Sequence, residues 1–280
     1  MARGDVRGGA QRRESGLMSV IERVRRRLSP MREVMSARAY RHVRGQPLFT
    51  PGETRLLDRP VVYSDRQGFL HSVQELFYDE VYRFRAKTDA PHIIDAGANI
   101  GLSVLYFKRL YPQATVVAYE PDAAICAMLR RNVADLPGVD VRQAAAWIED
   151  TELTFYAEGS LAGSVTTDFA HKAAPVTVRA ERLKDELAKR PVDFLKIDIE
   201  GAENRVLFDI EPELAQVDQL FFEYHSHTGE PQRLGDLLNL VGRAGFRYII
   251  NGAHCVRLPF VERSDQGFDL QLNISCFREP

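Results

Sequence analysis

The sequence has no long apolar stretch and few cysteines. No run approaches the roughly 18 consecutive apolar residues that a membrane-spanning helix requires. The N-terminal residues also lack the apolar segment of a secretion signal, so we expect a cytoplasmic protein. The 3 cysteines, Cys126, Cys255 and Cys276, are far apart and form no C-x-x-C pair. This spacing argues against a disulfide framework and against a zinc cluster.

Lysine is missing from the first 45 residues, which contain 12 arginines and 4 acids. The rest of the chain contains 25 basic and 35 acidic side chains. Because nucleic-acid affinity rests on Lys and Arg side chains that neutralise phosphates, this acidic body argues against a nucleic-acid partner. We expect a basic leader over residues 1–45 and one catalytic domain over residues 46–280.

Within the leader, residues 1–16 are rich in Gly and Arg and show no hydrophobic period, so we expect disorder there. From Leu17 to about Val43, apolar residues recur at helical spacing among arginines, although Pro30 interrupts the run. The pattern predicts a basic amphipathic helix. It packs on the domain or on a partner protein, or alternatively touches a membrane surface peripherally.

Residues 93–110 predict a buried strand, a tight loop and a helix whose N-terminus faces whatever the loop binds. Such a unit often binds a nucleoside-containing cofactor. A dinucleotide fingerprint requires G-x-G-x-x-G, but Asn99 and Leu102 occupy the second and third glycine positions. The departure favours S-adenosylmethionine over NAD. The candidate cofactor-binding residues are Asp95, Gly97, Ala98, Asn99, Gly101, Glu120, Pro121 and Asp198.

These residues have different expected roles. Asp95 ends the buried strand, so its carboxylate needs hydrogen-bond donors. These are loop amides and the ammonium group of a cofactor, or alternatively the carboxylate only holds its own loop in place. Gly97 and Gly101 permit close approach of the backbone to a ligand, and Asn99 tolerates a left-handed conformation. Glu120 ends the next strand, 19 residues after Gly101, where an acid accepts hydrogen bonds from ribose hydroxyls.

Alternating strand and helix patterns predict an α/β fold with a seven-stranded, mostly parallel sheet and helices on both faces. The expected strands are 93–95, 115–120, 140–145, 193–198, 218–225, 246–251 and 270–276. The expected helices are 102–110, 121–134, 181–190, 203–208 and 232–244.

Two further segments modify this pattern. Residues 152–157 and 175–179 alternate on either side of turn residues and predict a β insertion after the third strand. Residues 72–85 predict an amphipathic helix. As a lid over the cofactor loop it would place Tyr78 or Tyr82 near the cofactor, and plain core packing is the alternative.

Charged residues share one face at the ends of the fourth and fifth strands. Alternation places Lys196, Asp198 and Glu200 together, and likewise Glu223 and His225. For Lys196 a buried ion pair is the alternative to a role in the site. A carboxylate orients an imidazole and raises its basicity, so Asp198 and His225 are the candidate catalytic residues, with His225 as general base. A divalent metal is an alternative use of these groups, but the spacing matches no strong ligand pattern and we expect none.

Four motifs together resemble the FkbM family of methyltransferases. They are I-D-A-G-A-N-I-G at 94–101, A-Y-E-P at 118–121, L-K-I-D-I-E-G-A-E at 195–203 and E-Y-H at 223–225. The resemblance covers about residues 74–248, and its most specific part is K-I-D-I-E-G-A-E. Where the family usually has a Leu-Asp pair before the fourth strand, this chain has Ala180 and Glu181.

The resemblance implies a class I methyltransferase (Rossmann-like) fold, S-adenosylmethionine as donor, and methylation of a hydroxyl on a sugar, polyketide or related small-molecule acceptor. Two alternatives stay open. A non-catalytic partner protein would bind the adenosine cofactor without transferring methyl groups. An RNA methyltransferase is disfavoured by the acidic body, although the arginine-rich leader is compatible with it.

Overall fold

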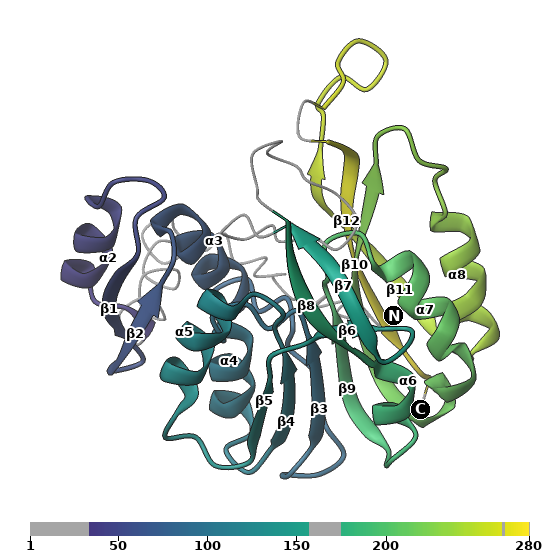
Figure 1. Cartoon of the computed structure of the whole chain (residues 1–280), viewed down its shortest axis with the longest axis horizontal. Coiled ribbons are helices and arrows are strands. Elements are labelled where there is room, and N and C mark those ends of the chain that lie inside the picture. Colours follow the sequence, from purple (N-terminus) through teal and green to yellow (C-terminus); the bar gives the residue numbers. More distant parts are fainter. Residues whose placement is uncertain (1–33, 157–174, 265–266, 280) are drawn as a thin grey trace, which may run out of the picture.

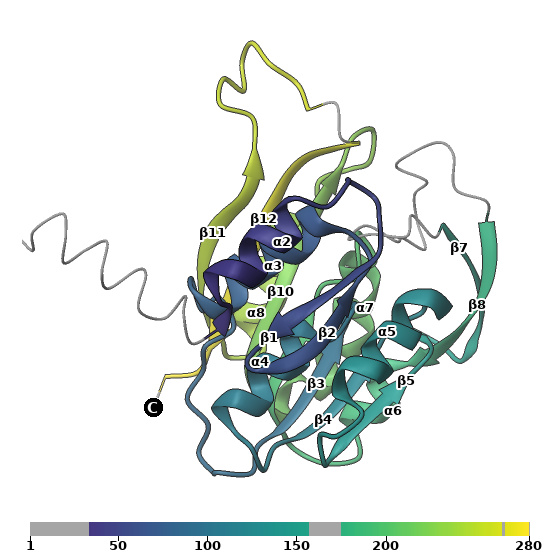
Figure 2. The same cartoon turned by 90° about the vertical axis from the view of Figure 1, so that its left-hand side faces the viewer.

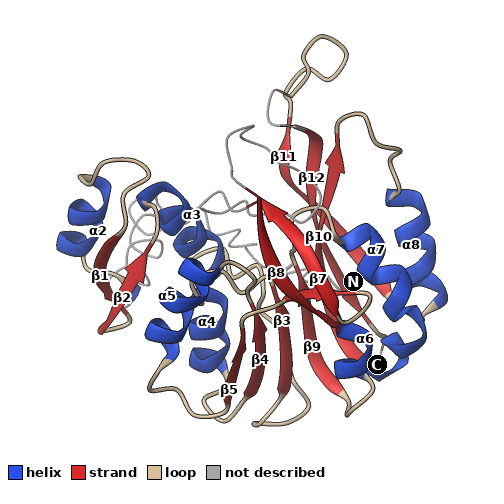
Figure 3. Cartoon of the chain, viewed as in Figure 1, coloured by secondary structure: helices blue, strands red, loops and turns tan. Residues whose placement is uncertain are grey.

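The central element of the fold is one seven-stranded sheet. The computed structural model describes residues 34–156, 175–264 and 267–279. The strand order is β11-β12-β10-β9-β3-β4-β5, and β12 runs antiparallel to both of its neighbours (Figure 3). The strands are β3 (His92–Ala96), β4 (Thr115–Tyr119), β5 (Val139–Arg142), β9 (Val192–Ile197), β10 (Val217–His227), β11 (Arg247–Cys255) and β12 (Phe268–Phe277).

Helices cover both faces of this sheet (Figure 1). On one face lie α3 (Arg66–Phe77), α4 (Leu102–Leu110) and α5 (Ala123–Val133), and on the other α6 (Leu183–Leu187), α7 (Glu203–Ile210) and α8 (Leu234–Arg243). Successive side chains of a strand point to opposite faces. Accordingly Ile93 belongs to the apolar cluster of the first face and Ile94 to that of the second.

Strand order, direction and layering together define the class I methyltransferase (Rossmann-like) topology. The predicted α/β fold, with seven mostly parallel strands and helices on both faces, is therefore confirmed. Because the inner strands are covered by helices on both sides, their sequences consist mostly of apolar residues.

The predicted β insertion is a separate three-stranded sheet. It contains β6 (Ala145–Trp147), β7 (Thr151–Tyr156) and β8 (Pro175–Arg182), and β7 pairs antiparallel with β8. The expected third strand 140–145 is wrong at its end, since β5 stops at Arg142 and Ala145 begins β6. Ala145 is buried opposite Ala180 of β8, so its pairing partner lies in the insertion. The turn residues expected between β7 and β8 lie outside the described residues.

A small N-terminal unit packs beside the first helical layer. It consists of α2 (Ala37–Arg44) and the hairpin of β1 (Gly52–Leu56) and β2 (Arg59–Tyr63), and Figure 2 shows α2 beside α3. Most of the predicted leader lies outside the described residues. Its last part contributes Val34, Met35 and Val43 to the core shared with α3 and α4. No helix of the described ranges is long and apolar enough to cross a membrane.

The expected helix over residues 72–85 is shifted. Helix α3 begins at Arg66 because the Asp65 carboxylate accepts hydrogen bonds from the backbone N–H groups of Gln67 and Gly68. It ends at Phe77, and Glu80 then adopts a left-handed φ of 52° that no helix continues. The apolar pattern correctly predicted a helix in this segment, but both of its ends were wrongly placed.

Candidate active site

The glycine loop, residues 97–101, follows β3 at the carboxyl edge of the sheet, where open parallel sheets bind ligands. Gly97 has a φ of 86° and Asn99 a φ of 48°, so the left-handed conformation expected for Asn99 is present. A Cβ atom on Gly97 would overlap the carbonyl oxygen of Asp198. Only glycine therefore lets this loop approach the end of β9.

Glu120 and Pro121 follow β4 and stand behind the glycine loop. The Glu120 carboxylate accepts hydrogen bonds from the N–H of Asn99 (3.0 Å) and the N–H of Asp122 (2.9 Å). Burial raises the pKa of Glu120 to about 7. Asp122 caps α5 by accepting hydrogen bonds from the N–H groups of Ala124 and Ile125.

Asp95 and Lys196 form a buried ion pair beneath the loop. Asp95 is fully buried, with one oxygen 3.3 Å from Lys196 Nζ and the other accepting from the Ser103 hydroxyl. These two donors take the place of the loop amides expected from the sequence. Lys196 also lies 3.3 Å from Asp198 and donates to the Gly97 carbonyl (2.5 Å). The ion-pair interpretation of Lys196 is confirmed.

A pocket opens between the glycine loop and α3. Gly97, Ala98 and Asn99 of the predicted cofactor-binding residues line it, together with Lys196. Of the two tyrosines proposed for this place, Tyr82 lines the pocket.

Helix α3 contributes an acid to this pocket that sequence reasoning missed. Glu75 lines the pocket. Burial raises the pKa of Glu75, and the nearby Asp198 raises it further. The residue pattern of α3 gives no signal for this role, because only the docking of the helix brings Glu75 to the loop.

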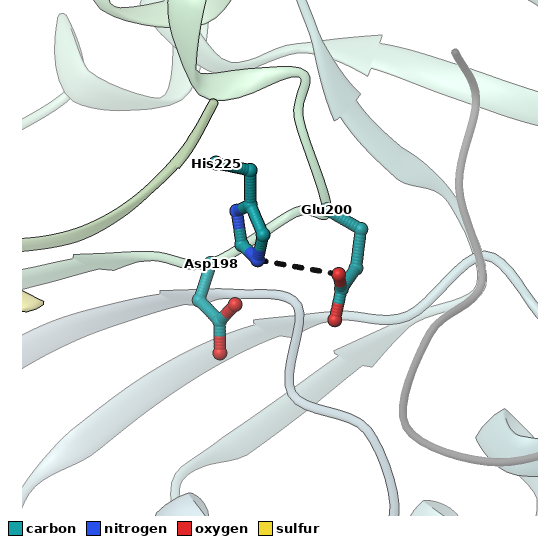
Figure 4. A group of neighbouring side chains, drawn as sticks. All are labelled: Asp198, Glu200 and His225. Atoms are coloured by element: carbon teal, nitrogen blue, oxygen red, sulfur yellow. Dashed lines mark ion pairs between the residues drawn. The ribbon is translucent and has the colours of Figure 1, made fainter. Parts of the chain in front are cut away.

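Asp198, Glu200 and His225 form what we call the acid–histidine cluster (Figure 4). One side-chain nitrogen or oxygen atom of each residue, of the kind that binds metal ions, lies within 4.8 Å of those of the other two. His225 Nε2 is 3.3 Å from a Glu200 oxygen and 3.9 Å from a Glu223 oxygen. The structure therefore brings together the two predicted catalytic residues and the acids that the alternation patterns placed on their faces.

The acid nearest to the other ring nitrogen is Glu203, which lies 3.3 Å from His225 Nδ1. Glu203 is fully buried and accepts hydrogen bonds from the N–H groups of Ile199 (2.8 Å) and Gly201 (2.9 Å). We expected Glu223 to orient the imidazole, but Glu203 is better placed to do so. Its position in the first turn of a helix suggests an ordinary capping acid, so the sequence concealed this contact.

The cluster is electrostatically crowded. Burial alone would lower the pKa of His225, but the carboxylates of Glu203 and Glu200 raise it well above its ordinary value. Burial and the neighbouring acids raise the pKa values of Glu200 and Glu223. The site can therefore hold a positive group at Nε2 of His225, and it can accept a proton there.

The topology is that of class I methyltransferases, and sequence comparison specifies the family. Residues 95–248 match the methyltransferase FkbM domain, so the chain belongs to the FkbM methyltransferase family. It is 35% identical over 170 residues to Methyltransferase 1 of Beauveria bassiana, covering 52% of this chain and 68% of that protein.

Two other proteins extend this comparison. The chain is 27% identical over 233 residues to 31-O-demethyl-FK506 methyltransferase FkbM of Streptomyces tacrolimicus, covering 71% of this chain and 84% of that one. A crystal structure of methyltransferase FkbM from Methylobacillus flagellatus matches with a TM-score of 0.45 and 17% identity, over 72% of this chain and 47% of that chain.

Proposed function

We propose that this methyltransferase uses S-adenosylmethionine to methylate a hydroxyl group of a carbohydrate or other small-molecule acceptor. The observation that carries the proposal is the contact between two dissimilar sites. Lys196 lies against the glycine loop on one side and against Asp198 of the acid–histidine cluster on the other. The name of the Streptomyces relative, which specifies an O-linked methyl position, supports oxygen as the acceptor atom.

The residues around the glycine loop fit this donor. Glu120 is a buried acid at the end of β4, where ribose hydroxyls are bound in related sheets. Glu75, which lines the pocket, supplies a carboxylate that suits an ammonium group. When bound, S-adenosylmethionine supplies a methyl group already activated by a sulfonium centre. The protein then has mainly to align the acceptor, an effect that can reach about 7 to 11 kcal/mol.

The acid–histidine cluster supplies the acceptor chemistry. The acceptor oxygen attacks the methyl carbon as the methyl–sulfur bond breaks, and the hydroxyl proton passes to His225 Nε2. Glu203 beside Nδ1 stabilises the resulting imidazolium. Asp198 is partly exposed beside the imidazole and orients the hydroxyl by accepting a hydrogen bond.

The substitution His225→Ala tests this assignment. It should retain S-adenosylmethionine affinity, measured by calorimetry, and lower turnover by about 10² to 10⁴-fold, because a general base contributes that much. Turnover is followed as S-adenosylhomocysteine released with a panel of hydroxylated small molecules and oligosaccharides.

His42→Ala is the matched control, because His42 is an exposed histidine of α2. It should change neither quantity. Unchanged turnover in His225→Ala contradicts the assignment of His225. Tight S-adenosylmethionine binding without S-adenosylhomocysteine release from any acceptor contradicts the proposed reaction.

A further inference from the structure

Two carboxylates and one imidazole converge in the acid–histidine cluster from different parts of the chain. Asp198 follows the end of β9, Glu200 lies in the next loop, and His225 is on β10. One possible ligand atom of each residue lies within 4.8 Å of the other two, and Figure 4 shows the imidazole directed toward the two acids. An ion held at about 2.0 to 2.2 Å from each ligand atom separates those atoms by roughly 3 to 4 Å, so small side-chain movements would close the cluster around one cation.

The imidazole is held as metal-bound histidines are held. His225 is 1% exposed, and each of its ring nitrogens faces a carboxylate oxygen at 3.3 Å. Nδ1 faces the fully buried Glu203 carboxylate at 3.3 Å, which itself is fixed by two backbone N–H groups. A carboxylate on one ring nitrogen fixes the ring and directs the other nitrogen toward a metal. Here that other nitrogen is Nε2, and it points at Glu200 and Asp198.

Nε2 of His225 and the nearest oxygen of Glu200 are 3.3 Å apart. If Nδ1 carries the proton toward Glu203, two electron-rich atoms face each other at this distance, and a cation between them removes the repulsion. A proton on Nε2 is the competing solution.

A further acid lies beside the cluster. Glu223 places its carboxylate 3.9 Å from Nε2 of His225. In the ranges that the structure describes, Lys196 is the sole lysine or arginine within ion-pair distance of Asp198, and it also pairs with Asp95. Burying several carboxylates together is costly, and a divalent cation would lower that cost.

We propose that Asp198, Glu200 and His225 bind one divalent cation of the Mg²⁺ or Mn²⁺ type. Two carboxylate ligands favour these ions over softer metals. Asp198 and Glu200 are partly exposed, so the remaining coordination positions face the open side of the site.

The consequence for catalysis rests on the proposed function. A cation at this place would bind the acceptor oxygen and lower the pKa of its hydroxyl. Because Nε2 of His225 would then be a ligand of the cation, the hydroxyl proton would pass to the neighbouring Glu223 carboxylate instead. Asp198 and His225 would act on the acceptor through the cation.

The test is a direct titration with MnCl₂ of the whole 280-residue chain, after metals have been removed with EDTA and dialysis. Free Mn²⁺ is measured by electron paramagnetic resonance, in the absence of donor and acceptor. We expect one saturable site per chain. Asp198→Asn, Glu200→Gln and His225→Gln should each weaken Mn²⁺ binding, and Glu203→Gln should weaken it about 10 to 100-fold because it only orients the histidine.

Asp236→Asn is the control, since Asp236 is an exposed acid of α8 paired with Arg233. It should leave Mn²⁺ binding unchanged, and circular dichroism confirms that each variant is folded. Absence of saturable binding to the wild-type protein, or binding that survives all three ligand substitutions, overturns the site. In a separate calorimetric titration, S-adenosylmethionine binding without any Mn²⁺ binding leaves the proposed function standing and removes the cation. Mn²⁺ binding without S-adenosylmethionine binding does the reverse.

Discussion

The glycine loop and the acid–histidine cluster lie on opposite sides of Lys196 and are built in opposite ways. The loop depends on backbone geometry, with left-handed residues at 97, 99 and 101 and the Asn99 N–H held by Glu120. The cluster depends on side-chain charge, with four acids near one imidazole. Under the proposed function, the glycine loop with Glu120 is the donor side, and the acid–histidine cluster is the acceptor side. Steric substitutions should therefore damage the donor side, and changes of charge or metal content should damage the acceptor side.

Lys196→Met removes the group that joins the two regions and should have the largest effect. Asp95 would keep a fully buried carboxylate without its ion-pair partner, and breaking such a pair costs about 3 to 5 kcal/mol. Urea denaturation measures this loss of unfolding free energy. Lys87→Met, which removes an exposed lysine paired with Asp218, should cost less than about 1 kcal/mol. Equal losses in the two variants would mean that Lys196 does not join the regions as described.

Gly97→Ala should damage the glycine loop most, although the atom that the new Cβ would overlap belongs to Asp198 of the cluster. Its Cβ would overlap the Asp198 carbonyl, so the loop must move, and we expect about a 100-fold loss of S-adenosylmethionine affinity from roughly 3 kcal/mol of strain. Gly229→Ala is a close control, because Gly229 has the same φ of 86° with no atom near the added Cβ. If both variants bind S-adenosylmethionine equally well, the close approach of Gly97 to the Asp198 carbonyl does not contribute to donor binding.

The pH dependence of stability tests whether the buried carboxyl group of Glu120 contributes charge to the donor side. The pKa of Glu120 in the folded protein is about 7, above the ordinary 4.5, so the folded state binds more protons between these values. Stability should fall as pH rises from about 4.5 to 7, by roughly 3 kcal/mol from this group. Denaturation of wild type and Glu120→Gln at pH 5 and pH 8 isolates the contribution, since the other acids are common to both. Parallel pH curves would contradict the assignment.

The smallest effect is expected for Asp122→Ala. Asp122 is adjacent to the donor side but caps α5, so its loss should cost about 1 kcal/mol of stability. S-adenosylmethionine affinity, measured by calorimetry, should stay within a factor of about two to three, as expected of a residue whose loss affects only the helix start. A large loss of donor affinity would extend the donor side to this residue.

The same contrast explains what sequence alone could predict. The glycine loop was predictable because its residues are consecutive and its conformations are local properties of Gly and Asn. Strands β3, β4 and β9 were located because each is a short, largely apolar run between turn residues. The start of α3 was missed because one side chain, Asp65, sets it.

The cluster could be predicted only in part. Alternation correctly grouped Glu223 with His225, yet the acid on Nδ1 is Glu203, which comes from α7. Such a contact depends on how a helix docks on a sheet, and periodicity carries no information about that. Glu75 was missed for the same reason, since only the placement of α3 brings it to the pocket.

Lys196 has one further consequence. Its single ammonium contacts the carbonyl of Gly97, the carboxylate of Asp95 and the carboxylate of Asp198. Any ligand that draws this ammonium toward one side changes the charge left on the other. Thermodynamic linkage makes any such influence mutual. The charge balance of the glycine loop and that of the acid–histidine cluster are therefore tied together at one buried lysine.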